Sequence, residues 1–196
     1  MTAPKRILII NGSPRRDGIV SRSLDIVRQR SESAGAECER IDICDCRFAP
    51  CTGCMACRKS GKCPLPHDDA HELAEKIGAA DILVIGTPTY WGGMSAQLKM
   101  AFERMVPLFM GESPRGLPQP RMKGRRALLI AACTTPWPFN IVMHQSRGAV
   151  RAMREIVSTA GMKVRSVELA GTKSLRGEPT GRMCRKIDKM TTKILK

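Results

Sequence analysis

The sequence has no long hydrophobic run. Its longest apolar stretches are Ile7–Ile10, Ile82–Ile85 and Ala127–Cys133. None approaches the roughly 18 residues that a membrane-spanning helix needs. The four apolar residues after Lys5-Arg6 are also too few for the core of a signal peptide. We therefore expect a cytoplasmic protein without a membrane partner.

Several motifs of other enzyme classes are missing. The G-x-G-x-x-G pattern is absent, which disfavours a classical NAD-binding fold, and there is no H-E-x-x-H metalloprotease motif. No cysteine has an arginine six positions later, as a thiolate phosphatase would need. Gly111 and Gly116 are followed by Leu117-Pro118, so this segment is not a nucleotide-triphosphate loop.

Negative charge is scarce. The 196 residues include 33 Lys and Arg against 18 Asp and Glu, a formal net charge of +15. Such a surplus favours anionic partners. No run of five like charges occurs, so we do not predict a nucleic-acid partner, and a nucleic-acid-binding protein remains an alternative supported by charge alone. With 42% hydrophobic and 26% charged residues, the chain should form a single globular domain over residues 1–196.

Short apolar runs alternate with helical patterns along the chain. This alternation predicts a parallel sheet with helices on both faces, and five strands suit one doubly wound domain. The predicted strands are Lys5–Ile10, Glu37–Ile43, Asp81–Gly86, Arg126–Ala132 and Lys163–Leu169. The predicted helices are Ser21–Ser33, Asp68–Ala80, Ser95–Pro107 (begun by a Ser cap), His144–Ala160 (stopped by Gly161) and about Glu178–Leu195.

Three loops of unusual composition leave the carboxyl ends of the predicted strands, where ligands of such sheets bind. The first, Asn11–Val20, precedes a helix, whose free N–H groups and dipole attract a phosphate. Ser13 and Ser21 add hydroxyl groups and Arg15 adds a positive charge. An ordinary strand-to-helix turn with a capping serine is the alternative.

The other two loops, Thr87–Met94 and Cys133–Asn140, hold four of only seven aromatic residues, namely Tyr90, Trp91, Trp137 and Phe139. Core packing would scatter aromatic side chains, so this concentration suggests a flat ring ligand. Its alternative is a hydrophobic lid or a dimer contact.

These residues resemble a known family. Gly12-Ser13-Pro14-Arg15, then Thr87–Gly92, and then Gln97-Leu98-Lys99 with Glu103-Arg104 look like the flavodoxin-like NADPH-dependent FMN reductases, particularly the iron-sulfur flavoprotein branch. The resemblance implies a five-stranded sheet of order 2-1-3-4-5, FMN bound non-covalently, NAD(P)H as electron donor, and a homodimer with the flavin near the interface.

The resemblance also implies roles for individual residues. Ser13 and Arg15 would hold the FMN phosphate, together with Gly18 and Ser21, and the second loop would line the isoalloxazine ring. The predicted FMN-binding residues are Ser13, Arg15, Gly18, Ser21, Pro88, Thr89, Tyr90, Trp91, Gly92, Thr134, Thr135 and Trp137. Many relatives have Gly-Asn-Thr where this chain has Gly18-Ile19-Val20, which removes two polar side chains. Their glycine-bearing third loop is replaced by the stiffer Thr134–Trp137, which affects substrate access.

Four of the nine cysteines are closely spaced. Cys51, Cys54, Cys57 and Cys63 follow the pattern C-x2-C-x2-C-x5-C within an excursion at about residues 44–66. Four such thiolates are able to hold one [4Fe–4S] cluster, and the spacing is similar to that of iron-sulfur flavoproteins. Free or disulfide-linked thiols, a redox pair of Cys54 and Cys57, and a zinc site that includes His67 and His71 remain open.

We expect an FMN-dependent oxidoreductase that passes electrons from NAD(P)H to a small acceptor such as a quinone, a free flavin or a metal ion. The flavin supplies the chemistry, so no catalytic side chain is predicted. The alternative is an iron-sulfur flavoprotein that carries electrons to a ferredoxin-like partner, whose acidic surface would suit the positive charge of this chain.

Overall fold

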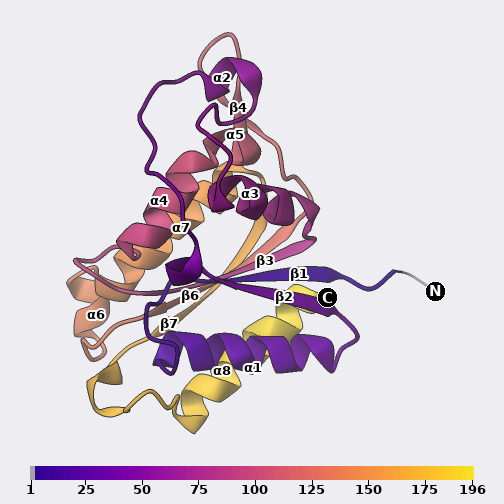
Figure 1. Cartoon of the computed structure of the whole chain (residues 1–196). Coiled ribbons are helices and arrows are strands. Elements are labelled where there is room, and N and C mark those ends of the chain that lie inside the picture. Colours follow the sequence, from indigo (N-terminus) through magenta and orange to yellow (C-terminus); the bar gives the residue numbers. More distant parts are fainter. Residues whose placement is uncertain (1–2) are drawn as a thin grey trace.

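The computed structural model describes residues 3–196, and its centre is a five-stranded parallel sheet (Figure 1). Its strands are β1 (Arg6–Asn11), β2 (Glu37–Asp42), β3 (Ile82–Pro88), β6 (Arg126–Ala132) and β7 (Lys163–Leu169). They lie in the order β2-β1-β3-β6-β7 with parallel pairing throughout. All five predicted strands are present. The short strands β4 and β5 form a separate hairpin, so β6 and β7 are the fourth and fifth strands of the main sheet. Its order β2-β1-β3-β6-β7 is therefore the predicted flavodoxin-like order 2-1-3-4-5.

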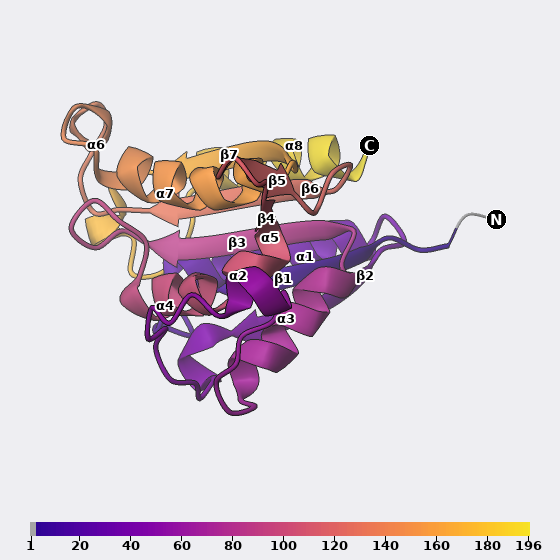
Figure 2. The ribbon, with the colours of Figure 1, turned by 90° about the horizontal axis from the view of Figure 1, so that it is seen from above.

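Helices cover both faces of the sheet. The longer helices are α1 (Ile19–Glu32), α3 (Asp69–Ala79), α4 (Ala96–Arg104), α7 (Gln145–Thr159) and α8 (Gly181–Leu195). In Figures 1 and 2, α1 and α8 lie on one face, whereas α3, α4 and α7 lie on the other. Each face has its own hydrophobic core, one around Leu24 and Ile187 and the other around Leu73, Leu98 and Met153.

The predicted helix Ser95–Pro107 differs from the structure in two ways. It ends at Arg104, and α5 (Val106–Phe109) follows, since Pro107 lacks the N–H that a continuous helix would use. Ser95 stands at the N-cap, but its hydroxyl group makes no capping hydrogen bond. Instead, the Ser95 N–H donates to Thr87 Oγ1 at 3.0 Å.

Short elements connect the main ones and were not predicted from the sequence. They are the helical turns η1 (Ile43–Asp45), α2 (Cys57–Ser60), α6 (Phe139–Val142) and η2 (Thr172–Ser174), and the antiparallel pair β4 (Met110–Glu112) and β5 (Pro118–Pro120). In the described part of the chain, every helix falls short of the length and apolarity that a bilayer crossing demands.

Candidate functional site

A cavity of about 850 Å³ lies at the carboxyl ends of the strands. Its volume falls in the range of pockets that hold small ligands and cofactors. Of the predicted binding residues, seven line it: Ser13, Arg15, Gly18, Pro88, Thr89, Tyr90 and Thr134. The site therefore forms where the loops after β1, β3 and β6 meet, at the point where the strand order reverses.

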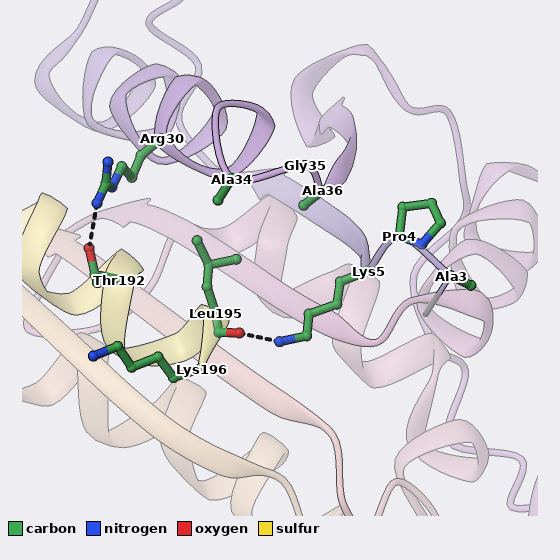
Figure 3. A pocket seen from close by; sticks show the side chains of 10 residues that line it. All are labelled: Ala3, Pro4, Lys5, Arg30, Ala34, Gly35, Ala36, Thr192, Leu195 and Lys196. Atoms are coloured by element: carbon green, nitrogen blue, oxygen red, sulfur yellow. Dashed lines mark hydrogen bonds between the residues drawn. The ribbon is translucent and has the colours of Figure 1, made fainter. Parts of the chain in front are cut away.

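Another cavity, of about 420 Å³, lies at the opposite end of the sheet (Figure 3). It is bordered by Lys5 before β1, by Arg30 of α1 and by the last residues of α8. Arg30 donates to Thr192 Oγ1 at 3.5 Å and Lys5 donates to the Leu195 carbonyl, so these side chains tie the termini together. No predicted binding residue lines this cavity, and we assign the site to the carboxyl end.

A chain of hydrogen bonds shapes the loop after β1. The Asn11 side chain donates to Asp42 Oδ1 at 2.5 Å and accepts from the Ser13 N–H at 3.0 Å. The Ser13 hydroxyl group in turn accepts from the Arg15 N–H at 3.2 Å. Because Asp42 binds the amide nitrogen of Asn11, the carboxylate fixes which way the amide faces and thereby holds the loop in its bend.

Arg40 of β2 holds Asp42 in place and thereby supports, as a brace, the hydrogen bonds of the loop after β1. It donates to Asp42 Oδ1 at 3.0 Å and to Asp25 Oδ1 at 2.8 Å. Burial alone would raise the pKa of Asp42, but hydrogen bonds from Arg40 and Asn11 hold that pKa below its ordinary value. Arg40 also donates to the Ser21 hydroxyl group at 2.6 Å, so this buried serine belongs to the brace and does not line the cavity.

The amino end of α1 opens toward the cavity. Gly18 stands at the N-cap without a side-chain capping bond, and the first turn contains no acidic residue. Gly18, Ile19 and Val20 all line the cavity. Free backbone N–H groups at a helix start are suited to a phosphate, and the one carboxylate in the cavity lining is that of Asp17, directly before the N-cap.

The loop after β3 forms a tight turn. Tyr90 and Gly93 exchange two backbone hydrogen bonds, and Trp91 and Gly92 between them have positive φ angles of 50° and 72°. The Thr89 N–H donates to the Ala132 carbonyl at 2.8 Å. The Thr89 hydroxyl oxygen, by contrast, is buried without a hydrogen-bond partner. An unsatisfied buried hydroxyl group calls for an explanation, and here it belongs to a residue that borders the cavity.

The aromatic residues separate into two groups. Tyr90 lines the cavity, whereas Trp91, Trp137 and Phe139 do not. Trp91 is completely exposed and Trp137 is 73% exposed. Gly92 and Thr135 also lie outside the lining. Most of the aromatic concentration seen in the sequence therefore forms an outer surface, next to exposed Val142 and Met143 at α6.

The segment after β7 is a part of the site that sequence reasoning missed. Thr172, Lys173, Arg176 and Gly177 line the cavity. A Cβ atom on Gly177 would lie 2.4 Å from the Asp17 carbonyl oxygen, so this segment packs directly on the loop after β1. The sequence does contain a signal for this part of the site, because the basic residues Lys173 and Arg176 follow closely after the fifth strand.

The cysteine segment is exposed and irregular. Cys51 and Cys54 are exposed, while Cys57 and Cys63 are half-buried. Burial raises the pKa of the Cys57 thiol, and the nearby sulfurs of the other three cysteines raise this pKa further. Within residues 3–196, no three His, Cys, Asp or Glu side chains are already arranged to hold a metal ion. The donor set suits an iron–sulfur cluster chemically, but its ligands are not gathered in this structure.

A buried arginine lies under the cysteine segment. The side chain of Arg104 in α4 is fully buried and pairs with both carboxylate oxygens of Asp68, at 2.8 and 3.0 Å. It also donates to the Ala49 carbonyl at 2.6 Å and, through Nε, to Cys63 Sγ at 3.2 Å. Although burial acts to raise the pKa of Asp68, its hydrogen bonds with Arg104 and His71 lower this pKa overall.

The fold and these loops agree with the comparison to known families. The sequence profile described as NADPH-dependent FMN reductase matches residues 5–173, and the chain belongs to this family. The suspected family and the flavodoxin-like fold are thereby confirmed. The family's description agrees with the expected FMN-dependent oxidoreductase class and with FMN and NADPH as its cofactors.

Several curated proteins with similar sequences are named iron-sulfur flavoproteins. An iron-sulfur flavoprotein of Methanocaldococcus jannaschii is 39% identical over 110 residues, 54% of each chain. One of Methanosarcina thermophila is 36% identical over 105 residues, 52% of each chain. The matched region spans about half the length of these curated relatives.

Solved structures show the same fold over nearly the whole chain. An FMN-dependent NADH-azoreductase from Bacillus anthracis, in complex with FMN, has a TM-score of 0.75 at 12% identity and covers 98% of this chain and 100% of its own. An NAD(P)H:quinone oxidoreductase from Methanothermobacter marburgensis has a TM-score of 0.69 at 21% identity, covering 96% and 92%.

Proposed function

We propose that this chain binds FMN in the cavity of about 850 Å³ and passes electrons from NAD(P)H to a small acceptor, such as a quinone, a free flavin or a metal ion. The observation that carries the proposal is the convergence of an uncapped helix start, a basic loop and an unpartnered threonine hydroxyl group on one cavity in a member of the FMN reductase family.

The phosphate of FMN binds at the loop after β1 in this proposal. Ser13 offers its hydroxyl group, Arg15 its charge, and the backbone from Ile19 onward its free N–H groups, since the Gly18 N–H donates to the Arg15 carbonyl. Ser21 does not contact the phosphate in this proposal. Its hydroxyl group accepts a hydrogen bond from Arg40 and so helps to hold the arginine that supports the loop. The brace of Arg40 and Asp42 keeps the loop in place before the ligand arrives, which lowers the cost of binding.

The ring of FMN lies between the loops after β3 and β6. Pro88 and Tyr90 provide apolar contacts, and the Thr89 hydroxyl group gains the hydrogen-bond partner that it lacks. Thr134 borders the same cavity. The other predicted ring-binding residues, Trp91, Gly92, Thr135 and Trp137, lie outside its lining. When bound, FMN would supply the redox chemistry that links NAD(P)H to the acceptor. The protein orients the ring and excludes water from one face.

Lys173 and Arg176 add positive charge at the remaining wall. Together with Arg15 and Arg16, they outnumber the one acidic residue of the lining, Asp17, although Arg16 is paired with Asp45 at 2.5 Å, and this excess positive charge attracts the phosphates of the nicotinamide donor. This electrostatic attraction should weaken as salt concentration rises.

An absorption spectrum after incubation with FMN tests the proposal. We expect a yellow protein whose flavin bands bleach on anaerobic addition of NADPH and return when a quinone is added. Failure to take up FMN would refute the FMN proposal. A flavoprotein that NADPH and NADH both leave oxidised would refute the enzymatic part and favour an electron carrier.

The alternative, an iron-sulfur flavoprotein that exchanges electrons with a ferredoxin-like partner, is favoured by one specific observation. Four cysteines lie within one segment at the spacing C-x2-C-x2-C-x5-C, and several relatives are named iron-sulfur flavoproteins. Cys51, Cys54, Cys57 and Cys63 would hold a [4Fe–4S] cluster, which transfers single electrons when bound. Iron and sulfide analysis of anaerobically purified protein tests this candidate.

We further propose that the chain is one FMN-binding unit that acts in the cytoplasm as a homodimer. The exposed surface of Trp91, Trp137, Phe139, Val142 and Met143 is the candidate contact, because monomeric proteins rarely leave large apolar patches uncovered. Molar mass from light scattering over a range of protein concentrations tests the dimer.

A further inference from the structure

We propose that Arg104 is a positioning residue for an iron–sulfur cluster: it fixes the two ends of the cysteine segment and donates a hydrogen bond to the sulfur of Cys63. This inference rests on the alternative function above, in which the four cysteines hold a [4Fe–4S] cluster. It concerns how the cluster is assembled and how its reduction potential is set.

The first argument is where the contacts of Arg104 lie. One guanidinium nitrogen binds the carbonyl of Ala49, just before Cys51, while Nε binds the sulfur of Cys63, the last of the four cysteines. Asp68 reinforces the first end, because it accepts from the Ala49 N–H at 3.3 Å. His71 reinforces the second, because its Nε2 lies 3.2 Å from the Cys63 carbonyl oxygen. Both ends of the segment are thus held by one buried ion pair.

The second argument is the contrast with what lies between these ends. Residues 50–62 contain no strand and only the single helical turn α2. Gly53, Met55 and Gly61 all have positive φ angles, and Cys51 and Cys54 are exposed. The hydrogen bonds inside the segment are local ones, and none of residues 50–62 is buried. A segment with fixed ends and no buried residue is able to rearrange around a ligand, since local opening is least costly where buried contacts are few.

The third argument is chemical. Cys63 is the one cysteine of the four whose sulfur accepts a hydrogen bond from an arginine side chain, among the bonds of residues 3–196. An N–H donor of this kind stabilises a thiolate ligand and draws electron density from the cluster, and hydrogen bonds to the sulfurs help set cluster potentials. Loss of the donor should therefore lower the reduction potential.

Arg104→Lys separates this role from a simple ion pair. Lysine keeps the positive charge beside Asp68, but its single nitrogen is unable to reach Ala49, Asp68 and Cys63 in the same way. Arg125→Lys is the matched control, because Arg125 also makes an internal guanidinium bond, to the Ile77 carbonyl at 3.1 Å, but contacts no part of the cysteine segment.

The experiment is anaerobic reconstitution of full-length protein with ferrous iron and sulfide. Iron content, the chelator concentration that removes half of the iron, and the midpoint potential are then measured. We expect about four irons per chain in the wild type. For R104K we expect an apparent iron affinity about 10- to 100-fold lower, as is typical when a residue that orients metal ligands is lost, and a more negative potential. R125K should match the wild type in both.

Trypsin gives an independent readout before any iron is added. Arg58, Lys59 and Lys62 are cleavage sites between the two fixed ends. Cleavage there should be about tenfold faster in R104K, because the open segment becomes more populated when a charged hydrogen bond is lost.

The outcomes separate the inference from the function on which it rests. A wild type that never loads iron refutes the cluster, and the role of Arg104 with it. A wild type that loads while R104K shows the same affinity and potential refutes only the role of Arg104. If R104K fails to retain FMN and is misfolded, Asp68→Glu takes its place, since it displaces the guanidinium group without removing either charge. Unchanged iron affinity and potential in Asp68→Glu would then overturn the inference.

Discussion

A partly buried arginine, Arg40, and a fully buried one, Arg104, support two different regions of this molecule. Arg40 lies under the loop after β1, and all its side-chain partners belong to α1 or β2. Arg104 lies under the cysteine segment, and it binds one irregular stretch at both ends. The first arginine completes a site whose cavity already exists. The second holds only the boundaries of a site whose ligands are not gathered. An arginine–aspartate pair therefore supports a preformed cavity after β1, whereas another such pair supports a cysteine segment that is able to change its shape.

Replacing each arginine with methionine should have the largest effect and tests whether the two arginines differ in their contribution to stability. Arg104→Met leaves the Asp68 carboxylate without its partner, which should cost about 3–5 kcal/mol of unfolding free energy. Arg40→Met should cost less, about 2 kcal/mol, because the side chains of Arg40 (17% exposed) and Asp25 (36% exposed) are closer to water than that of Arg104 (0% exposed). Urea unfolding monitored by circular dichroism measures both values.

The two variants should also differ in function. Arg40→Met should weaken FMN binding and leave tryptic cleavage at residues 58–62 unchanged, whereas Arg104→Met should do the reverse. Equal loss of FMN from both variants would contradict the separation of the two regions.

Acid titration tests the brace under the loop after β1. Because the pKa of Asp42 is lower in the folded chain than its ordinary value of 3.8, its stabilising contribution is complete above that value. The contribution is lost as the pH falls through the lowered pKa. Asp42→Asn should remove this acid-dependent part of the stability.

Asp42→Asn should also weaken FMN binding about tenfold, through loss of a charged hydrogen bond that orients Asn11. Isothermal titration with FMN measures this effect. An Asp42→Asn variant whose acid unfolding curve matches that of the wild type would exclude the brace.

Thr89→Val should have opposite effects on the empty and the FMN-bound protein. Removal of an unpartnered buried hydroxyl group should leave the FMN-free chain as stable as before or up to about 1 kcal/mol more stable. FMN should bind about 2- to 10-fold more weakly, because the ligand loses a hydrogen bond. Thermal unfolding with and without FMN reports both effects. Thr191→Val is the control for FMN binding, since it also removes a buried hydroxyl group, one that donates to the Ile187 carbonyl at 2.9 Å, but lies outside the cavity.

Trp91→Ser should produce the smallest effect on folding stability, within about 0.5 kcal/mol, because the side chain is completely exposed. The same change should shift a dimer toward monomer at micromolar concentration. Light scattering after gel filtration gives the molar mass. Leu117→Ser removes an equally apolar exposed side chain beside β5 and should leave the molar mass unchanged.

Much of the fold was predictable because it is encoded locally. The strand Arg126–Ala132 and the helix starting near Asp68 follow from short apolar runs and capping residues, which require no knowledge of distant contacts. The loops after β1 and β3 could likewise be placed at the site, because every parallel strand ends at the same edge.

The remaining features depend on which distant segments meet. Nothing near Ser21 in the sequence indicates that Arg40 will occupy its hydroxyl group. Nothing near Cys63 indicates that Arg104, 41 positions later, will donate to its sulfur. Trp91 was predicted to line a ring ligand from the clustering of aromatic residues in two loops and from the family resemblance, and the structure places it outside the cavity and completely exposed.

Gly148 has a consequence beyond packing. A side chain there would place a Cβ atom 2.1 Å from the Gly92 carbonyl oxygen, so α7 and the turn after β3 are in backbone contact without intervening side chains. That turn carries a cavity wall on one side and Trp91 on the other. A ligand inside and a second subunit outside would thus act on the same rigid unit. If so, each would favour the other by thermodynamic linkage, and retention of flavin would depend on protein concentration.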